Sequence, residues 1–206
     1  MIEQASLRER KKARTRASLR EHALRLFREQ GYQATTVEQI AAAAEVSPST
    51  FFRYFPTKED VVLQDDMDTR VLEAFARQPA DLSPIAAVRA ALREAWGSFT
   101  ADEWEQLEEG ARLSDSIPEI RARAMNEFAR TINAIAGALA GRTGRRPDDL
   151  RVRVFAGAVV GAMMAVFLPE ELEHGNHPEA VASTVGPHSV ARLDEALELL
   201  ERGLPL

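Results

Sequence analysis

Two short helical patterns separated by three residues constrain the fold of this chain more than any other feature. The first pattern runs from Thr35 to about Ala44, with apolar residues at helical spacing, and the second begins at Pro48. Only Glu45-Val46-Ser47 lies between them. A break of that length is typical of the corner of a helix-turn-helix.

The residues at the helix starts support these boundaries. Thr35 and Glu38 have the spacing of a capping box, in which two side chains satisfy the free N–H groups of the first turn. Thr57 and Asp60 repeat the pattern, and Ser47 is the expected N-cap of the second short helix. Each element of the N-terminal region therefore has a predicted start.

Strand patterns are nearly absent from the whole chain, so we predict an all-α fold. We expect an N-terminal three-helix head that contains the helix-turn-helix, in residues 1–57, and a larger helical bundle in residues 58–206. Residues 1–8 are expected to be disordered and residues 169–188 to form a linker. The expected helices cover about 6–30, 35–44, 47–55, 58–77, 84–101, 103–115, 118–141, 147–168 and 188–203.

The charge is distributed unevenly between these two parts. The chain has a net charge of −6, but residues 1–60 hold 11 basic and 8 acidic residues, which is 11 − 8 = +3. The remainder holds 15 basic and 24 acidic residues, which is 15 − 24 = −9. A basic run from Arg8 to Arg28 suggests a surface that binds a polyanion, although a basic helix face can also be merely solvated.

The side chains of the helix-turn-helix suit DNA. In this motif the second helix enters the major groove and presents the residues at its start to base edges. Hydroxyl groups can donate or accept hydrogen bonds there, whereas basic and hydroxyl groups nearby can bind phosphates. The candidate DNA-binding residues are Thr35, Thr36, Ser47, Pro48, Ser49, Thr50, Arg53, Tyr54 and Lys58, with Lys11, Lys12 and Arg14 from the basic run.

The stretch TTVEQIAAAAEVSPSTFFRYFPTKED, residues 35–60, resembles the N-terminal motif of the TetR family of bacterial regulators. The resemblance extends from Arg20 to Asp60. It implies a homodimer whose two heads bind a near-palindromic operator, and a helical body that binds a small ligand. It implies base contacts from residues 47–50 and Tyr54, and phosphate contacts from Thr35, Thr36, Arg53 and Lys58.

Two residues depart from the family pattern. Glu45 stands at the corner where the family commonly has glycine, so a left-handed conformation there would cost about 1 kcal/mol. Phe52 stands where the family commonly has tyrosine, so a hydroxyl contact to DNA from that position is lost. We expect Phe51, Phe52 and Phe55 to be core residues, because the apolar residues Leu26, Val37 and Ile40 need side chains to pack against.

The body suggests two further sites. Apolar faces of the last two helices can pack within one chain or against a symmetry mate, and the resemblance favours a dimer. The candidate interface residues are Val152, Phe155, Val159, Leu193, Leu197 and Leu200. The candidate ligand-pocket residues are Trp96, Phe99, Trp104, Leu113, Met125, Phe128, Ile132 and Met163, which are core residues by default.

The C-terminal half also resembles TetR-like regulators related to the mycofactocin regulator. The segments RARAMNEFAR and GRTGRRPDDLRVRVFAGAVVGAM, residues 121–130 and 141–163, carry this resemblance. It implies a small hydrophobic ligand, with a long-chain acyl-CoA as one candidate.

Patterns typical of an enzyme are absent, and no cofactor is expected. There is no glycine-rich phosphate loop and no HExxH motif, and His174 and His177 with Glu173 have a spacing in a polar segment that does not favour a metal. With no cysteine and no apolar run of about 20 residues, we expect a cytoplasmic protein without a membrane segment. Two alternatives remain open: a helical acyl-binding protein or enzyme whose head binds proteins, and a regulator without a ligand.

Overall fold

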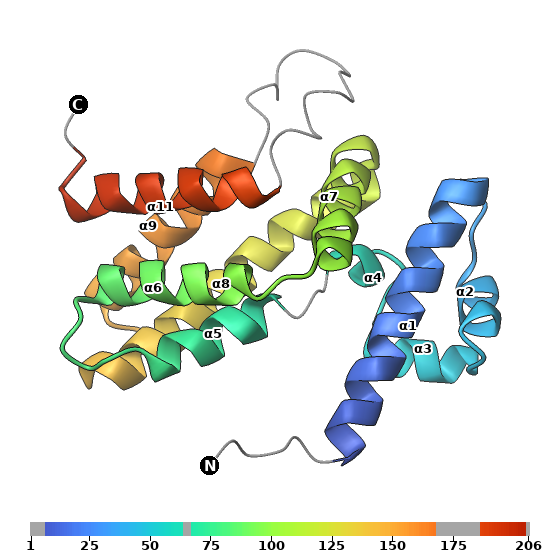
Figure 1. Ribbon diagram of the computed structural model, residues 1–206, viewed down its shortest axis with the longest axis horizontal. Coiled ribbons are helices and arrows are strands. Elements are labelled where there is room, and N and C mark those ends of the chain that lie inside the picture. The colour runs from blue at the N-terminus through green and yellow to red at the C-terminus, as the bar shows by residue number, and fades with distance from the viewer. Residues whose placement is uncertain (1–6, 64–66, 168–185, 205–206) are drawn as a thin grey trace. The chain divides into compact units, whose positions relative to one another are not determined.

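The computed structural model describes residues 7–63, 67–167 and 186–204, and every regular element in these ranges is a helix (Figure 1). The expected all-α fold is confirmed. The contacts divide the chain into residues 1–65, here called the head, and residues 66–206, here called the body. The division falls later than residue 57 because α4 packs against α1.

The head contains four helices. They are α1 (Leu7–Gln30), α2 (Val37–Ala43), α3 (Pro48–Tyr54) and α4 (Asp60–Leu63). Helix α1 already includes Leu7 and Arg8, so those two residues are not part of a disordered tail. Its end is confirmed at Gly31, whose φ of +83° is readily adopted by glycine.

The corner between α2 and α3 is a Schellman turn. The N–H of Val46 donates to the carbonyl of Ala41 (2.9 Å), and the N–H of Glu45 donates to the carbonyl of Ala42 (3.1 Å). Glu45 has a φ of +55°, so a residue that is not glycine adopts the left-handed conformation at this corner. The two bonds satisfy carbonyls at the end of α2 and direct the chain into α3.

Two of the three expected caps are as predicted, and one is displaced by one residue. Ser47 accepts from the N–H of Thr50, and Thr57 and Asp60 form a reciprocal capping box. Helix α2, however, is capped by Thr36 with Gln39, so the expected box of Thr35 with Glu38 was wrong. The reason is that the Thr35 side chain points into the head.

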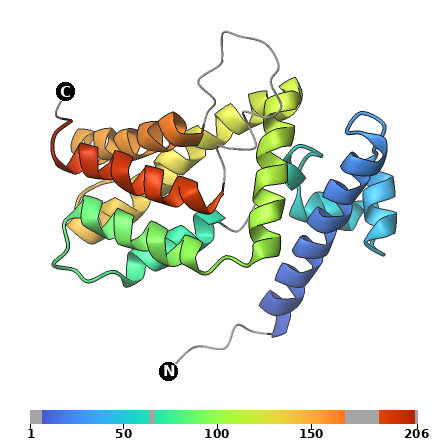
Figure 2. The same ribbon diagram turned by 45° about the horizontal axis from the view of Figure 1, so that its top comes forward.

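The body consists of α5 (Met67–Arg77), α6 (Pro84–Gly97), α7 (Ala101–Ser116), α8 (Pro118–Thr143), α9 (Leu150–Phe167) and α11 (Pro187–Glu201). In both Figure 1 and Figure 2, α11 lies along α6 and α9, and α5 lies beside α6. The expected helix at 84–101 ends earlier, at Gly97, because Thr100 and Glu103 form a capping box that starts α7.

Helix α6 is joined to α11 by an arginine that binds three carboxylates. Nε and Nη2 of Arg89 donate to the two oxygens of Asp194 (2.9 and 3.0 Å), and Nη1 donates to Glu201 (2.8 Å). Nη2 of Arg89 also lies 3.3 Å from Glu198. The hydrogen bonds from Arg89 hold the pKa of Asp194 below its ordinary value, against the opposing effect of burial. These bonds fix α11 against the outer side of α6.

Helix α9 is long and apolar enough to span a membrane by length and composition, although no membrane segment was expected. The core helix of a soluble protein can pass the same test. Within the chain, 33% of its 18-residue apolar window is buried. The buried side of α9 packs into the body core, and Leu150 and Val154 are exposed on another side.

Candidate DNA-binding surface and ligand pocket

The start of α3 presents a group of hydroxyls on the surface of the head. Ser47, Pro48 and Ser49 are exposed, and Thr50 is half-buried. The Ser47 hydroxyl lies 2.8 Å from that of Ser49 and 2.9 Å from that of Thr50. The Schellman turn and the Ser47 cap fix the position of this group, so hydroxyls that can both donate and accept are presented to solvent by a rigid corner.

The rest of α3 separates into a buried side and an exposed side. Phe51 and Phe55 are fully buried, as expected, but Phe52 is 52% exposed, so its assignment to the core was wrong. Its ring packs edge-on against that of Phe51, with a distance of 5.6 Å between the ring centroids. Arg53 is exposed and its guanidinium lies 5.4 Å from the ring centroid of Tyr54. Helix α3 thus exposes polar, basic and aromatic groups together.

Of the two threonines before α2, only one is available to a phosphate. Thr36 is exposed, and its hydroxyl accepts from the N–H of Gln39 (3.2 Å). Thr35 is 1% exposed and donates to the carbonyl of Gly31 (2.8 Å). A phosphate contact from the Thr35 side chain is therefore contradicted by its burial, because this side chain holds the α1–α2 turn together.

Lys58 also has an internal role that the sequence did not reveal. Its Nζ donates to the carbonyls of Tyr32 (2.9 Å) and Thr35 (3.0 Å), and lies 3.9 Å from the ring centroid of Tyr32. Glu59 accepts from the hydroxyl of Tyr32. Burial alone would raise the pKa of Glu59, but hydrogen bonds and the charge of Lys58 lower it. Lys58 is therefore mainly a clamp on the α1–α2 turn and has at most one N–H left for a phosphate.

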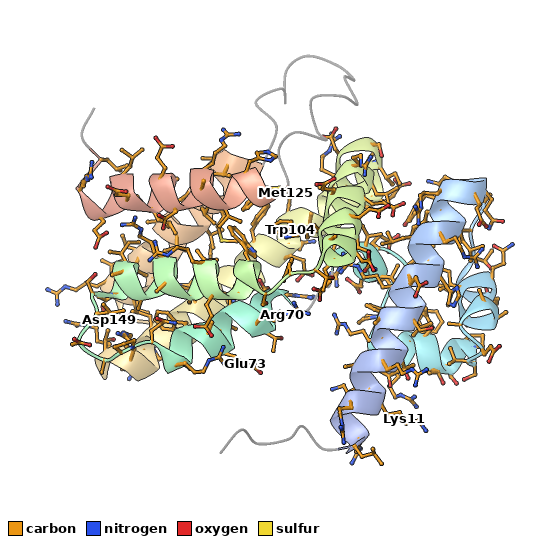
Figure 3. The ribbon with its side chains drawn as sticks, in the orientation of Figure 1. Lys11, Arg70, Glu73, Trp104, Met125 and Asp149 are labelled. Carbon is orange, nitrogen blue, oxygen red and sulfur yellow. The ribbon has the colours of Figure 1, made fainter. Side chains whose placement is uncertain are left out.

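The remaining basic candidates lie on the first turns of α1. Lys11, Lys12 and Arg14 are exposed, and Figure 3 shows Lys11 extending from the N-terminal part of this helix. Exposed cations attract phosphates without constraint on sequence. The structure thus presents a basic surface on α1 and a hydroxyl surface on α3 within the same head.

The body contains an apolar pocket, here called the slot. Its volume is about 60 Å³, and its walls come from α5, α6, α8 and α9. The lining residues are Asp68, Val71, Leu72, Phe75, Val88, Leu92, Trp96, Thr131, Ala134, Ile135, Ala138, Leu139, Phe155, Val159 and Met163. The sequence left open whether the body holds a cavity, and the structure contains one.

The predicted pocket residues agree with this slot only in part. Trp96 and Met163 line it, whereas Phe99, Trp104 and Ile132 pack against the body core without lining it. Leu113, Met125 and Phe128 are not lining residues, and Met125 is 48% exposed. Sequence reasoning omitted α5, although Val71, Leu72 and Phe75 form an apolar stripe at helical spacing that could have indicated a wall.

The predicted interface residues are mostly buried inside a single chain. Val152, Val159, Leu193 and Leu197 are at most 1% exposed, so a partner cannot touch them in this conformation. Phe155 lines the slot together with Val159, and Leu200 packs against the body core. The assignments of Val152, Val159, Leu193 and Leu197 were wrong because the inner faces of α9 and α11 close the body itself. Phe155 and Leu200 are only partly buried, so their role in an interface stays a prediction.

The candidate metal residues Glu173, His174 and His177 lie outside the described residues, as does most of the expected linker at 169–188. Among the residues that the structure does describe, no group of three or more His, Asp or Glu side chains is arranged to hold a metal ion.

Comparison with known protein families shows to which family a chain with this head and body belongs. The family described as bacterial regulatory proteins, tetR family, matches residues 19–64, and the MftR C-terminal domain family matches residues 82–205. The chain belongs to the TetR family. Both resemblances seen in the sequence are confirmed, and the chain is a ligand-responsive DNA-binding transcriptional regulator.

Two relatives agree with this assignment. The transcriptional regulator TcmR of Streptomyces glaucescens is 39% identical over 69% of this chain and 66% of its own length, slightly less than two thirds of that protein. A Mycobacterium tuberculosis protein named as the mycofactocin biosynthesis transcriptional regulator MftR is 28% identical over 85% of this chain and 86% of its own length. Both relatives are named as regulators, which favours a non-enzymatic protein.

A solved structure supports the fold over nearly the whole chain. It is the TetR-family repressor FadR of Thermus thermophilus, solved in complex with lauroyl-CoA. Its TM-score is 0.55 and its sequence identity is 27%, with coverage of 93% of this chain and 95% of that one.

Proposed function

We propose that this TetR-family member is a cytoplasmic repressor that binds a near-palindromic operator as a homodimer and leaves it when an apolar ligand occupies the slot. The observation that carries the proposal is the cluster of hydroxyls of Ser47, Ser49 and Thr50, which a rigid corner holds at the surface of the head that also contains the basic α1. Helix α3 enters the major groove, and Lys11, Lys12, Arg14, Thr36 and Arg53 bind phosphates.

The dimer interface that we propose is the outer face of α9. Leu150 and Val154 are 76% and 62% exposed on this helix, although they are apolar. Gly157, Ala158, Gly161 and Ala165 follow at helical spacing on the same side, so a partner helix can approach closely there, with Met164 as the one larger residue beside them. Leu199 on α11 is also apolar and 41% exposed. Burial against a second copy removes this surface from water.

The slot is proposed as the ligand site. Its lining is almost entirely apolar, which suits an apolar guest. At about 60 Å³ it is much smaller than the roughly 300–1,000 Å³ of usual ligand pockets. A sizeable ligand therefore binds only if helices α5, α6, α8 and α9 separate. A ligand that binds the opened arrangement better than the closed one shifts the population of the dimer between two head spacings.

A long-chain acyl-CoA is the first ligand to test. The support is the similarity to the lauroyl-CoA complex of FadR from Thermus thermophilus, together with the match to the MftR C-terminal domain. A regulator that binds no ligand does not need a pocket in its body. The slot therefore favours a ligand-responsive regulator over one without a ligand.

The experiment is fluorescence anisotropy of a labelled duplex taken from the DNA that flanks the gene of this protein. The protein is titrated at two salt concentrations, and lauroyl-CoA is then added to the complex. We expect a specific, salt-sensitive complex that the ligand dissociates. Thr50→Ala should weaken specific binding by about 1–3 kcal/mol through the loss of a base contact, while binding to random DNA stays the same.

The matched control is Thr143→Ala, which removes the same groups from an exposed position on α8 in the body. Equal affinities of the wild type and Thr50→Ala for the operator would refute the placement of α3. A specific complex that persists in lauroyl-CoA would refute acyl-CoA as the ligand and retain the DNA-binding function.

A further inference from the structure

Helix α3 carries one large apolar side chain that is exposed, Phe52. It is 52% exposed, whereas Phe51 and Phe55 beside it in the sequence are fully buried. Among the described residues of the head, the other exposed large apolar side chain is Leu7, which is the first residue of α1. A single exposed apolar side chain is ordinary on a protein surface, so the neighbours of Phe52 decide what its exposure means.

The neighbours of Phe52 are residues that the proposed function places against base edges. Pro48 and Ser49 precede Phe52 by four and three residues, so the three side chains lie on one face of the helix. All three are exposed, as is Arg53 beside them. Side chains of a helix lean toward its N-terminus, so Phe52 leans toward the first turn of α3. Phe52 therefore shares its surface with the hydroxyl of Ser49.

The position of the ring is restricted by the core beneath it. The rings of Phe52 and Phe51 pack edge-on, with 5.6 Å between their centroids and an angle of 87° between their planes. The ring of Phe51 lies in turn 5.7 Å from that of Phe55, again between centroids. Edge-to-face packing is a favourable arrangement of two aromatic rings. The ring of Phe52 is thus held in place before DNA binds, and binding costs it little rotamer freedom.

The major groove offers one apolar group that such a ring can contact. Of the four bases only thymine presents a methyl group there, whereas the other base edges present hydrogen-bond donors and acceptors. Phe52 has no hydroxyl, so it cannot bind a phosphate through a hydrogen bond. Against the amino group of cytosine, its ring would displace water without replacing the hydrogen bond. An apolar contact to thymine is therefore the favourable use of this ring in the groove.

We propose that Phe52 determines operator specificity at one position of each half-site, where its ring contacts the 5-methyl group of a thymine. This inference rests on the proposed placement of α3 in the major groove. It assigns a DNA contact to the position at which phenylalanine replaces the tyrosine common in the family. The hydroxyls of Ser49 and Thr50 bind polar base edges, and Phe52 adds an apolar contact beside them.

The test removes the methyl group from the DNA. The operator is located by footprinting in the DNA that flanks the gene of this protein. Each thymine of the half-site is then replaced by uracil, one position at a time and in both half-sites, and fluorescence anisotropy gives the affinity. Uracil keeps every hydrogen-bonding group of thymine and lacks only the methyl group.

We expect one position at which uracil weakens binding of the wild type. The loss should be about fourfold per half-site, or about 16-fold for both, which corresponds to the burial of one methyl group in each.

Variants of Phe52 show whether its ring makes the contact. Phe52→Ala should bind the thymine and uracil operators with affinities that differ by less than about 1.5-fold, because the partner of the methyl group is gone. Phe52→Tyr keeps the ring and should keep the wild-type effect of uracil. The matched control is Leu7→Ala, which removes the other exposed apolar side chain of the described head and should also keep that effect. Because Phe52 is exposed, both of its variants should have the helical content of the wild type by circular dichroism.

The methyl group of Thr50 is a competing partner for thymine. An effect of uracil that persists in Phe52→Ala would overturn the inference, and its loss in Thr50→Ser would assign the contact to Thr50. A wild type that binds every uracil operator as tightly as the original one would overturn the inference as well, and this comparison needs no variant. If no specific complex forms, the proposed DNA-binding function fails and this inference with it, whereas a specific complex without a uracil effect overturns the inference alone.

Discussion

The head and the body are each stabilised internally by a different kind of contact. In the head, polar groups fix the turns: Lys58 binds two carbonyls of the α1–α2 turn, and the Schellman turn at Glu45 sets the start of α3. In the body, apolar walls surround a slot, and ion pairs such as that of Arg89 join the helices at the periphery. Directional bonds specify one shape, whereas apolar contacts tolerate displacement, so the head is suited to recognition and the body to a change of shape.

The largest expected effect on operator affinity comes from a substitution on the outer face of α9. Val154→Arg places a charge in the proposed interface, where it would be buried without a partner, at a cost of several kcal/mol. We expect a monomer by light scattering and a loss of operator affinity of at least about 100-fold, which corresponds to about 2.7 kcal/mol. The same variant should leave the helical content of the single chain unchanged, because Val154 is exposed there.

Ala129→Arg on the exposed face of α8 is the control for this substitution. It introduces the same charge into the body and should leave the dimer intact. A Val154→Arg protein that remains dimeric would show that the chain associates through another surface.

Substitution of Lys58 is expected to have a smaller effect. It tests whether Lys58 stabilises the head or binds DNA. Lys58→Met keeps much of the packing but removes two hydrogen bonds to carbonyls, so it should destabilise the head by about 1–2 kcal/mol. Thermal unfolding and faster hydrogen exchange in residues 31–37 would report this loss. The salt dependence of operator binding should change little.

Arg53→Met is the counterpart of this variant, because Arg53 is exposed on α3. It should leave the melting temperature unchanged and reduce the slope of log K against log salt by about 1. If Lys58→Met flattened the salt dependence and left the stability intact, Lys58 would be a phosphate ligand rather than a clamp.

The smallest effect, on the stability of the chain, is expected from a substitution of Glu45 in the turn between α2 and α3. Glu45 adopts a left-handed conformation that costs a residue with a side chain about 1 kcal/mol. Glu45→Gly should therefore stabilise the chain by up to about 1 kcal/mol, or a few degrees in melting temperature for a chain of this size. An unchanged or lower melting temperature would show that Glu45 makes contacts that offset its strain.

The local features of the head could be predicted from the sequence because they depend on neighbouring residues. The cap at Ser47 and the box of Thr57 with Asp60 each follow from a short pattern. The error at Thr35 has a similar origin, since Thr35 and Thr36 are both plausible caps. Only the tertiary packing that buries Thr35 distinguishes them.

The sites of the body could be predicted only coarsely because they depend on which helix faces meet. Periodicity shows that Val159 and Leu197 lie on apolar faces, but it does not show whether those faces close the chain or bind a second copy. The role of Lys58 was missed for the same reason, since its carbonyl partners are 26 and 23 residues away in the sequence.

The most direct test of the account is the distance between the two heads of the dimer with and without a ligand. The chain has no cysteine, so Ala42→Cys on the exposed side of α2 gives a single site for a spin label on each head. Pulsed electron paramagnetic resonance would be recorded for the free dimer, the operator complex and the dimer with lauroyl-CoA. We expect the operator complex to show one narrow distance that fits half-sites about 34 Å apart, and the ligand to shift the free dimer away from it. An unchanged distance distribution at a ligand concentration that dissociates the operator complex would contradict the proposal that the slot acts through head spacing.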